Sequence, residues 1–150
     1  MKVQRTIHCF IFQVILAVIT TASCVADISR TKQNVAIEGY DTTAYFTAGR
    51  PMKGDPKISY RWSGVTWLFA SQDAKKMFMQ KPDKYIPQFG GYCANGLSDG
   101  HKIEGDPKNW RIIDGKLYLY FSQYGREQWS GNVKPLLDMA GETWHDLSEK

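Results

Sequence analysis

The stretch that decides the fold is Trp110-Arg111-Ile112-Ile113-Asp114-Gly115-Lys116-Leu117-Tyr118-Leu119-Tyr120. Two runs rich in β-branched and aromatic residues flank Asp114-Gly115, a pair that suits a type I′ turn. Asp106-Pro107, just before the first run, is itself a turn signal. The stretch therefore predicts an antiparallel β-hairpin.

A second hairpin is predicted earlier in the chain. Residues 58–62 alternate between apolar and polar, Ser63-Gly64 turns the chain, and residues 65–69 run back. Ser71 follows as a helix N-cap, and Lys81-Pro82 ends the helix that it begins. The predicted helix covers residues 71–81.

The rest of the chain predicts further helices. Residues 122–129 suit a short helix, and residues 132–147 carry apolar side chains at helical spacing. Strands and helices occur in blocks, without strict alternation, which favours an α+β fold with a small antiparallel sheet built from hairpins. No linker and no internal repeat of 20 to 50 residues is evident, so residues 35–148 are predicted to form a single domain.

The N-terminus has the features of a secretory signal peptide. A basic start is followed by a 14-residue apolar run, residues 9–22, which is shorter than the about 20 residues of a membrane-spanning helix. Ala26 suits the cleavage site, so residues 1–26 are predicted to be removed and the protein to be exported, periplasmic or secreted. Two other interpretations are a lipoprotein anchored through Cys24 and an uncleaved membrane anchor. Polar residues 27–34 are expected to be a loose leader.

Removal of the signal peptide changes the charge and the cysteine content. Loss of Lys2 and Arg5 takes the net charge from +4 to +2, and no basic stripe remains, so nucleic acid is not an expected partner. A cleaved chain without lipid keeps Cys93 alone, which excludes an internal disulfide. No transmembrane segment is expected in the mature chain.

Residues 60–85 resemble the YHS domain, a small module named for a Tyr-His-Ser tripeptide. The resemblance is carried by Tyr60-Arg61-Trp62-Ser63-Gly64, by Trp67-Leu68-Phe69-Ala70-Ser71, and by the later residues Ala74, Phe78, Pro82 and Tyr85. A wider similarity to exported YHS domain-containing proteins covers roughly residues 37 to 147. It includes Gly39-Tyr40-Asp41, Ala44-Tyr45-Phe46 and Lys116-Leu117-Tyr118-Leu119.

The resemblance implies binding of a soft metal, copper above all. In the family the ligands are the cysteines of a Cys-Ser-x-x-Cys segment, which suit Cu(I) or Zn(II). In this chain Ala70 and Ala74 take those two positions, and Trp62 stands where the tripeptide has histidine. Because these side chains cannot ligate a metal, any metal site must be built elsewhere.

Cys93, within Phe89-Gly90-Gly91-Tyr92-Cys93-Ala94, is the best remaining candidate ligand. The paired glycines suit an elbow that leads into a helix starting near Tyr92, whose first-turn N–H groups would stabilise a thiolate. His101, eight residues later, could fold back to complete a two-coordinate site for copper or another soft transition metal. The alternatives are a buried structural Cys93 with glycines needed only for packing, and a solvent-facing His101.

Three functions remain open. The first is a non-enzymatic, exported YHS-type domain that binds a soft metal through Cys93 and His101. The second is a small-ligand or protein-interaction module with a structural cysteine; four tyrosines could line its cleft or belong to the core, namely Tyr40, Tyr45, Tyr60 and Tyr85. The third is a thiol-dependent redox enzyme, which would lack a resolving cysteine. No signature of the common hydrolase, phosphate-binding or haem-binding classes is present, so no catalytic residue is assigned.

Overall fold

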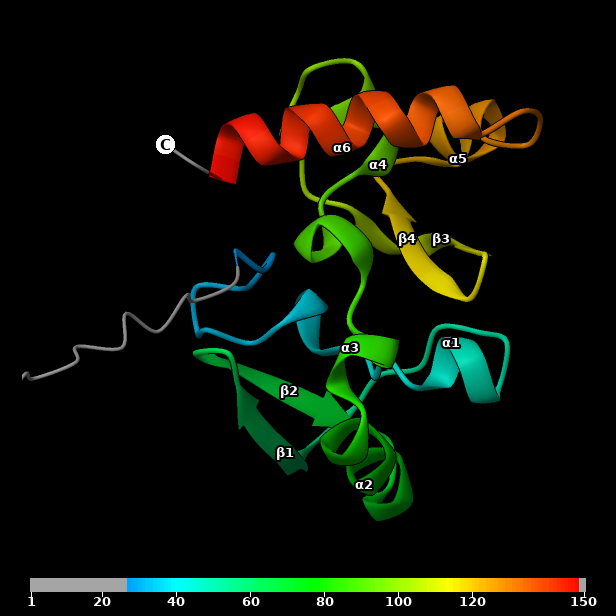
Figure 1. Ribbon diagram of the computed structural model, residues 1–150. Coiled ribbons are helices and arrows are strands. Elements are labelled where there is room, and N and C mark those ends of the chain that lie inside the picture. The colour runs from blue at the N-terminus through cyan, green and yellow to red at the C-terminus, as the bar shows by residue number, and fades with distance from the viewer. Residues whose placement is uncertain (1–26, 149–150) are drawn as a thin grey trace, which may run out of the picture.

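Two β-hairpins form the framework of the structure, a computed structural model that describes residues 27–148 (Figure 1). Strand β1 (Asp55–Trp62) pairs antiparallel with β2 (Val65–Phe69), and β3 (Asp106–Ile113) pairs antiparallel with β4 (Lys116–Tyr120). Both turns have positive φ at their two central residues, as a type I′ turn requires. Both predicted hairpins are confirmed.

Short helices connect and flank the hairpins, and the fold class is α+β as predicted. In chain order the helical elements are η1 (Ile37–Gly39), α1 (Ala44–Thr47), α2 (Gln72–Gln80), α3 (Pro82–Tyr85), η2 (Gln88–Gly91), α4 (Ala94–Ser98), α5 (Gln123–Gln128) and α6 (Lys134–Ser148). The predicted helices 71–81, 122–129 and 132–147 correspond to α2, α5 and α6. None of the helices within residues 27–148 has the length and apolar character needed to cross a bilayer.

The two hairpins are copies of one motif. Gly54-Asp55-Pro56-Lys57 and Gly105-Asp106-Pro107-Lys108 are identical in sequence, and the second begins 51 residues after the first. This interval falls just outside the range of 20 to 50 residues in which the sequence predicts no repeat. The chain is therefore built from two halves, the first from η1 to α3 and the second from η2 to α6.

Local geometry repeats along with the sequence. Each first strand has an irregularity after its opening aspartate, and that carboxylate accepts a hydrogen bond from the backbone N–H two residues later, at 2.9 Å for Asp55 and 2.8 Å for Asp106. Ser71 caps α2 through the N–H of Ala74, and Ser122 caps α5 in the same way. Shared turns, caps and strand register explain why both segments fold alike.

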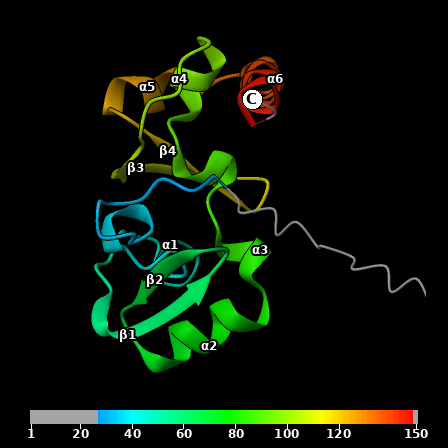
Figure 2. The same ribbon diagram turned by 90° about the vertical axis from the view of Figure 1, so that its left-hand side faces the viewer.

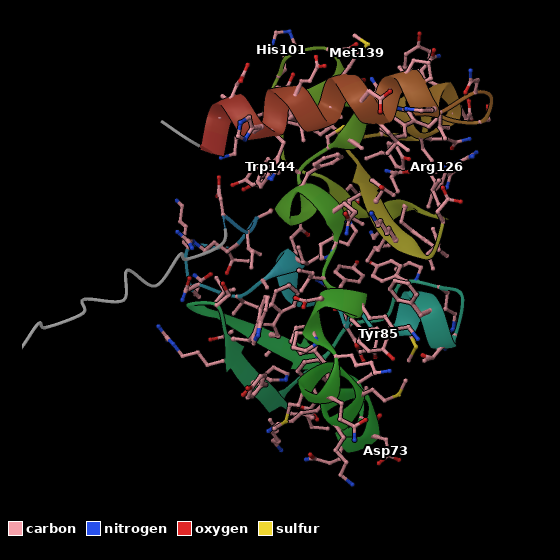
Figure 3. All side chains as sticks on the ribbon, viewed as in Figure 1. Asp73, Tyr85, His101, Arg126, Met139 and Trp144 are labelled. Carbon is pink, nitrogen blue, oxygen red and sulfur yellow. The ribbon has the colours of Figure 1, made fainter. Side chains whose placement is uncertain are left out.

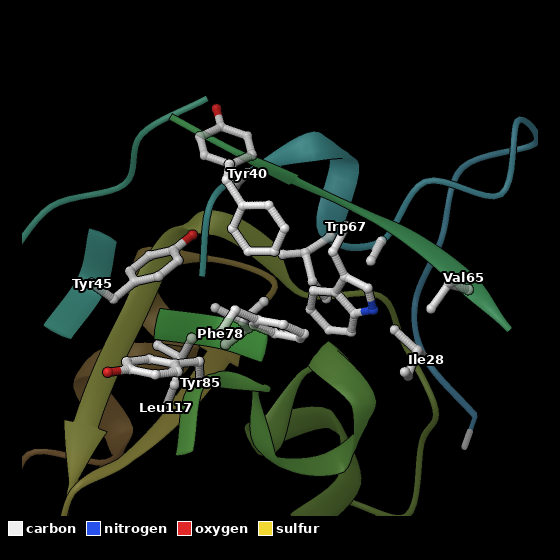
Figure 4. Close-up of a cluster of buried hydrophobic side chains, with 12 residues drawn as sticks. Ile28, Tyr40, Tyr45, Val65, Trp67, Phe78, Tyr85 and Leu117 are labelled. Carbon is white, nitrogen blue, oxygen red and sulfur yellow. The ribbon is translucent and has the colours of Figure 1, made fainter. Parts of the chain in front are cut away.

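Each half builds its own hydrophobic core. Phe78 of α2 and Trp129 after α5 occupy equivalent places in the repeat, and both are fully buried. The first core surrounds Phe78 and contains Trp67 and Tyr45 (Figure 4). The second core surrounds Trp129 and is covered by α6, which has no counterpart in the first half (Figure 2).

Contacts between the halves join the two cores. Leu117 and Leu119 of β4 belong to the first core, although the strand lies in the second half. The hydroxyl of Tyr45 donates a hydrogen bond of 2.8 Å to the carbonyl of Pro107. Burial holds the pKa of Tyr45 well above its usual value. Tyr40 and Tyr85 are also buried in the first core, and Tyr60 is partly buried against it, so the four tyrosines belong to the core.

The prediction that residues 27–34 form a loose leader is wrong. Ile28 is only 3% exposed and lies beside Trp67 in the first core (Figure 4). The backbone N–H of Ser29 donates to the carbonyl of Gly90, and Arg30 forms a bridge with Ala36. One apolar residue and a few backbone hydrogen bonds attach this polar segment to both halves. The predicted signal peptide, residues 1–26, and the alternative lipid site at Cys24 lie outside the described residues.

Candidate functional site

Cys93 is a helix cap in the structure. It is the N-cap of α4, and its Sγ accepts a hydrogen bond of 3.2 Å from the N–H of Gly96. Its side chain is 3% exposed and packs in the second core. The helix predicted to start near Tyr92 begins at Ala94, so Cys93 is its N-cap and lies before the first turn, in which the sequence placed it.

The glycine elbow before Cys93 is explained by close packing. Gly90 and Gly91 both have positive φ, 61° and 87°, which glycine adopts at little cost. A Cβ on Gly90 would lie 1.9 Å from the carbonyl oxygen of Asp27, and one on Gly91 would lie 2.4 Å from Cδ1 of Ile37. Neighbouring segments of the chain fill the space beside both glycines.

The backbone of His101, but not its side chain, is hydrogen-bonded to the helix that Cys93 caps. Its N–H donates to the carbonyl of Gly96 at 2.7 Å, while the N–H of the same glycine bonds the Cys93 sulfur. The His101 side chain is exposed and points outward at the edge of the molecule (Figure 3). Among residues 27–148, no three His, Cys, Asp or Glu side chains come together as a metal site. The metal site at Cys93 and His101 stays a prediction.

The counterpart of Cys93 in the first half is Asp41, because the N–H of Asp41 donates to the carbonyl of Met52 as that of Cys93 does to Ile103. Asp41 and Cys93 are 52 residues apart, one more than the interval of 51 between Met52 and Ile103. Asp41 is 1% exposed, and its carboxylate accepts hydrogen bonds from the N–H and the hydroxyl of Thr43 and from the N–H of Ala70. Asp41 and Cys93 each follow a positive-φ elbow and bond the start of a short helix. This equivalence supports the structural interpretation of Cys93, because a side-chain acceptor is used at the same place in both halves.

A cavity of about 220 Å³ lies where the two halves meet. Its apolar wall includes Trp67 of β2, Phe89 of η2 and Trp144 of α6. Trp144 points from α6 toward the N-terminal segment (Figure 3), and Ile28 of that segment completes the wall. Residues 86–90, which run from the end of α3 into η2, form the remaining side.

The polar groups at this cavity differ in how they are bonded. The Asp27 carboxylate accepts hydrogen bonds from Lys102 Nζ and from the Tyr92 hydroxyl, the latter at 3.3 Å. The Lys102 ammonium also lies 4.5 Å from the centre of the Tyr92 ring and 5.7 Å from that of Trp144, which is favourable cation–π geometry. Burial and the Asp27 charge raise the pKa of Tyr92. Gln88, by contrast, lines the cavity with a side-chain amide that has no hydrogen-bond partner among the described residues.

The sequence did not indicate this cavity. Its walls come from segments that are far apart in the chain, and Trp144 reads only as one member of the apolar stripe of a helix. Ile28 lies in a segment too polar to predict packing. The one feature of the sequence that could have indicated the cavity is the repeated Gly-Asp-Pro-Lys segment. Its spacing places residues 86–90 at the junction of two units.

Comparison of the chain with models of protein families, with curated proteins and with solved structures finds no match. The resemblance to YHS domains therefore remains a prediction from the residues quoted above.

Proposed function

We propose that this protein is a non-enzymatic binding module that holds a small, largely apolar ligand between its two halves. The observation that carries the proposal is the cavity of about 220 Å³ with the rings of Trp67, Phe89 and Trp144 in its wall. An apolar cavity of about 150 Å³ is enough to bind benzene. This cavity therefore suits one aromatic or aliphatic ring with short substituents.

The position of the cavity and its polar group further restrict the class of ligand that it can bind. Small-molecule sites occur preferentially at junctions between structural units and combine apolar walls with a few polar groups. Gln88 supplies such a group, since its amide, which has no partner within residues 27–148, can both donate and accept a hydrogen bond. We expect a ligand whose ring packs on the aromatic wall and whose one hydroxyl, carbonyl or amide group bonds Gln88.

An NMR titration tests this proposal. We expect 4-methylphenol and indole, the two probes, to shift the signals of the Gln88 amide and the Trp144 indole N–H in a saturable manner. Trp144→Ala removes one wall and should weaken binding by about tenfold or more, as truncation of a buried aromatic contact does. Trp110→Phe is the matched control, because Trp110 packs against the first core and does not line the cavity. Absence of saturable shifts with both probes, or equal binding by Trp144→Ala, would contradict the proposal.

Binding of a soft metal through Cys93 and His101 is the second candidate. One observation favours it: the N–H of Gly96 donates to Cys93 Sγ, and the carbonyl of Gly96 accepts from the N–H of His101, so both residues are hydrogen-bonded to the same residue of α4. The YHS resemblance also supports a copper-type ion. Binding would require the buried thiol to become accessible and the exposed imidazole to turn inward.

Titration with Cu(I) against a competing chelator tests the metal candidate. Wild-type protein should bind more tightly than both Cys93→Ala and His101→Ala if the two side chains are ligands. Equal affinity of Cys93→Ala and wild type would remove Cys93 from any metal site. The cavity titration is independent of this result, since neither residue lines the cavity.

A further inference from the structure

A second hollow, of about 460 Å³, lies between α4, α5 and α6 in the second half. These three helices lie together at one end of the molecule in both views (Figures 1 and 2). The lining is mainly polar and contains one aromatic ring; its side chains include Asn95, Asp99, Tyr124, Gln128 and Asn132. None of these residues belongs to the cavity between the halves.

Tyr124 is exposed in this hollow although the fold does not require an aromatic residue there. It is 71% exposed, on the first turn of α5. Its counterpart in the repeat is Asp73, 51 residues earlier, which occupies the first turn of α2. The same motif therefore forms with a small charged residue at this position. The Tyr124 ring is free to contact a ligand, because packing within the motif does not use it.

A chain of hydrogen bonds that starts in the second core holds the carboxylate of Asp99 in place. The indole N–H of Trp129, a fully buried residue, donates to Asn95 Oδ1 at 3.2 Å. Asn95 Nδ2 in turn donates to Asp99 Oδ2 at 3.2 Å. This chain of hydrogen bonds fixes both polar groups, and fixed polar groups lose less conformational entropy when a ligand binds.

Two further amides in the hollow are available for hydrogen bonds. The side-chain amides of Gln128 and Asn132 make no hydrogen bond with any other described residue. Together with Asp99 they offer acceptors and donors of the kind that pair with hydroxyl groups. The lining residues include no Lys, Arg or His, so the hollow does not favour phosphate or another anion.

We propose that this hollow binds a neutral saccharide. One sugar ring would place its C–H face on the Tyr124 ring, while its hydroxyl groups bond Asp99 and the amides of Gln128 and Asn132. An amphipathic aromatic side chain beside fixed polar groups matches the two faces of a sugar, one rich in C–H bonds and one rich in hydroxyls. The volume of about 460 Å³ accommodates a mono- or disaccharide.

NMR titration with cellobiose and with N-acetylglucosamine tests this site. We expect saturable shifts of the Asn95, Gln128 and Asn132 side-chain amides, with dissociation constants of about 1 mM. Tyr124→Asp copies the residue that the first half uses at the equivalent position, so the fold should be retained. This variant should bind about tenfold more weakly.

Two controls separate binding at the hollow from other effects. Asp73→Ala changes the equivalent position of the first half and should leave saccharide affinity unchanged. Asp99→Asn keeps the shape of the side chain but removes its charge, and it should weaken binding several-fold. The proposal is overturned by absence of saturable shifts with both sugars, by shifts confined to residues outside the hollow, or by equal affinity of Tyr124→Asp and wild type.

Discussion

Removal of the Cys93 sulfur tests the structural interpretation of this residue. Cys93→Ala deletes the side-chain acceptor for the Gly96 N–H, and loss of an N-cap acceptor costs about 1 kcal/mol. It also deletes one buried atom of a side chain that is 3% exposed, which costs about 1 kcal/mol more in lost burial and residual cavity. We therefore expect unfolding free energy to fall by about 2 kcal/mol, and Tm by roughly 8 °C for a domain of this size.

Cys93→Ser is the matched variant, because its hydroxyl keeps an acceptor at the same place. Serine is a better cap than alanine, so urea unfolding should place this variant between wild type and Cys93→Ala. In parallel, a thiol reagent applied to the native protein should modify Cys93 slowly, at a rate that rises with urea; peptide mass spectrometry identifies the modified residue. Rapid native modification together with an unchanged stability of Cys93→Ala would refute the reasoning.

Two further predictions concern contacts made by the junction of the halves. Gly90→Ala should lower the free energy of unfolding by about 2 kcal/mol or more, since the φ of 61° strains alanine and its Cβ would meet the Asp27 carbonyl oxygen. Gly100→Ala is the control, because Gly100 has a φ of 81° with open space around it, and it should cost only about 1 kcal/mol. Equal losses of stability in urea melts would argue against a packing role for Gly90. Tyr45→Phe should cost about 1 to 2 kcal/mol at neutral pH, because the Pro107 carbonyl loses its partner. Burial raises the pKa of Tyr45, so above about pH 10 the unfolded state binds fewer protons than the folded state and stability falls as pH rises. Urea melts across this range should show a shallower alkaline decline for Tyr45→Phe than for wild type, and identical pH profiles would contradict this assignment.

Local signals predicted the secondary structure because each acts over a few residues. Asp114-Gly115 adopts the positive φ values that a type I′ turn requires, and Ser71 caps α2 as its position before an apolar helical face predicts. The apolar spacing of residues 132–147 likewise corresponds to α6. These features depend on neighbouring residues, so one sequence suffices to find them.

Features that depend on distant contacts were not predictable in the same way. The duplication is almost hidden because the two halves share mainly the Gly-Asp-Pro-Lys segment that begins at Gly54 and again at Gly105. Ile28 packs only because Trp67 and the elbow at Gly90 are already in place. The cavity follows from the same assembly, since it exists only where the halves, the N-terminal segment and α6 meet.

The position of a bound ring tests the central claim most directly. Intermolecular NOEs between 4-methylphenol and the protein report which side chains lie next to the ligand. The account predicts NOEs from the phenol ring to Ile28, Ile86 and Trp144, which surround the cavity between the halves. NOEs confined to other side chains, with none to these three, would contradict it.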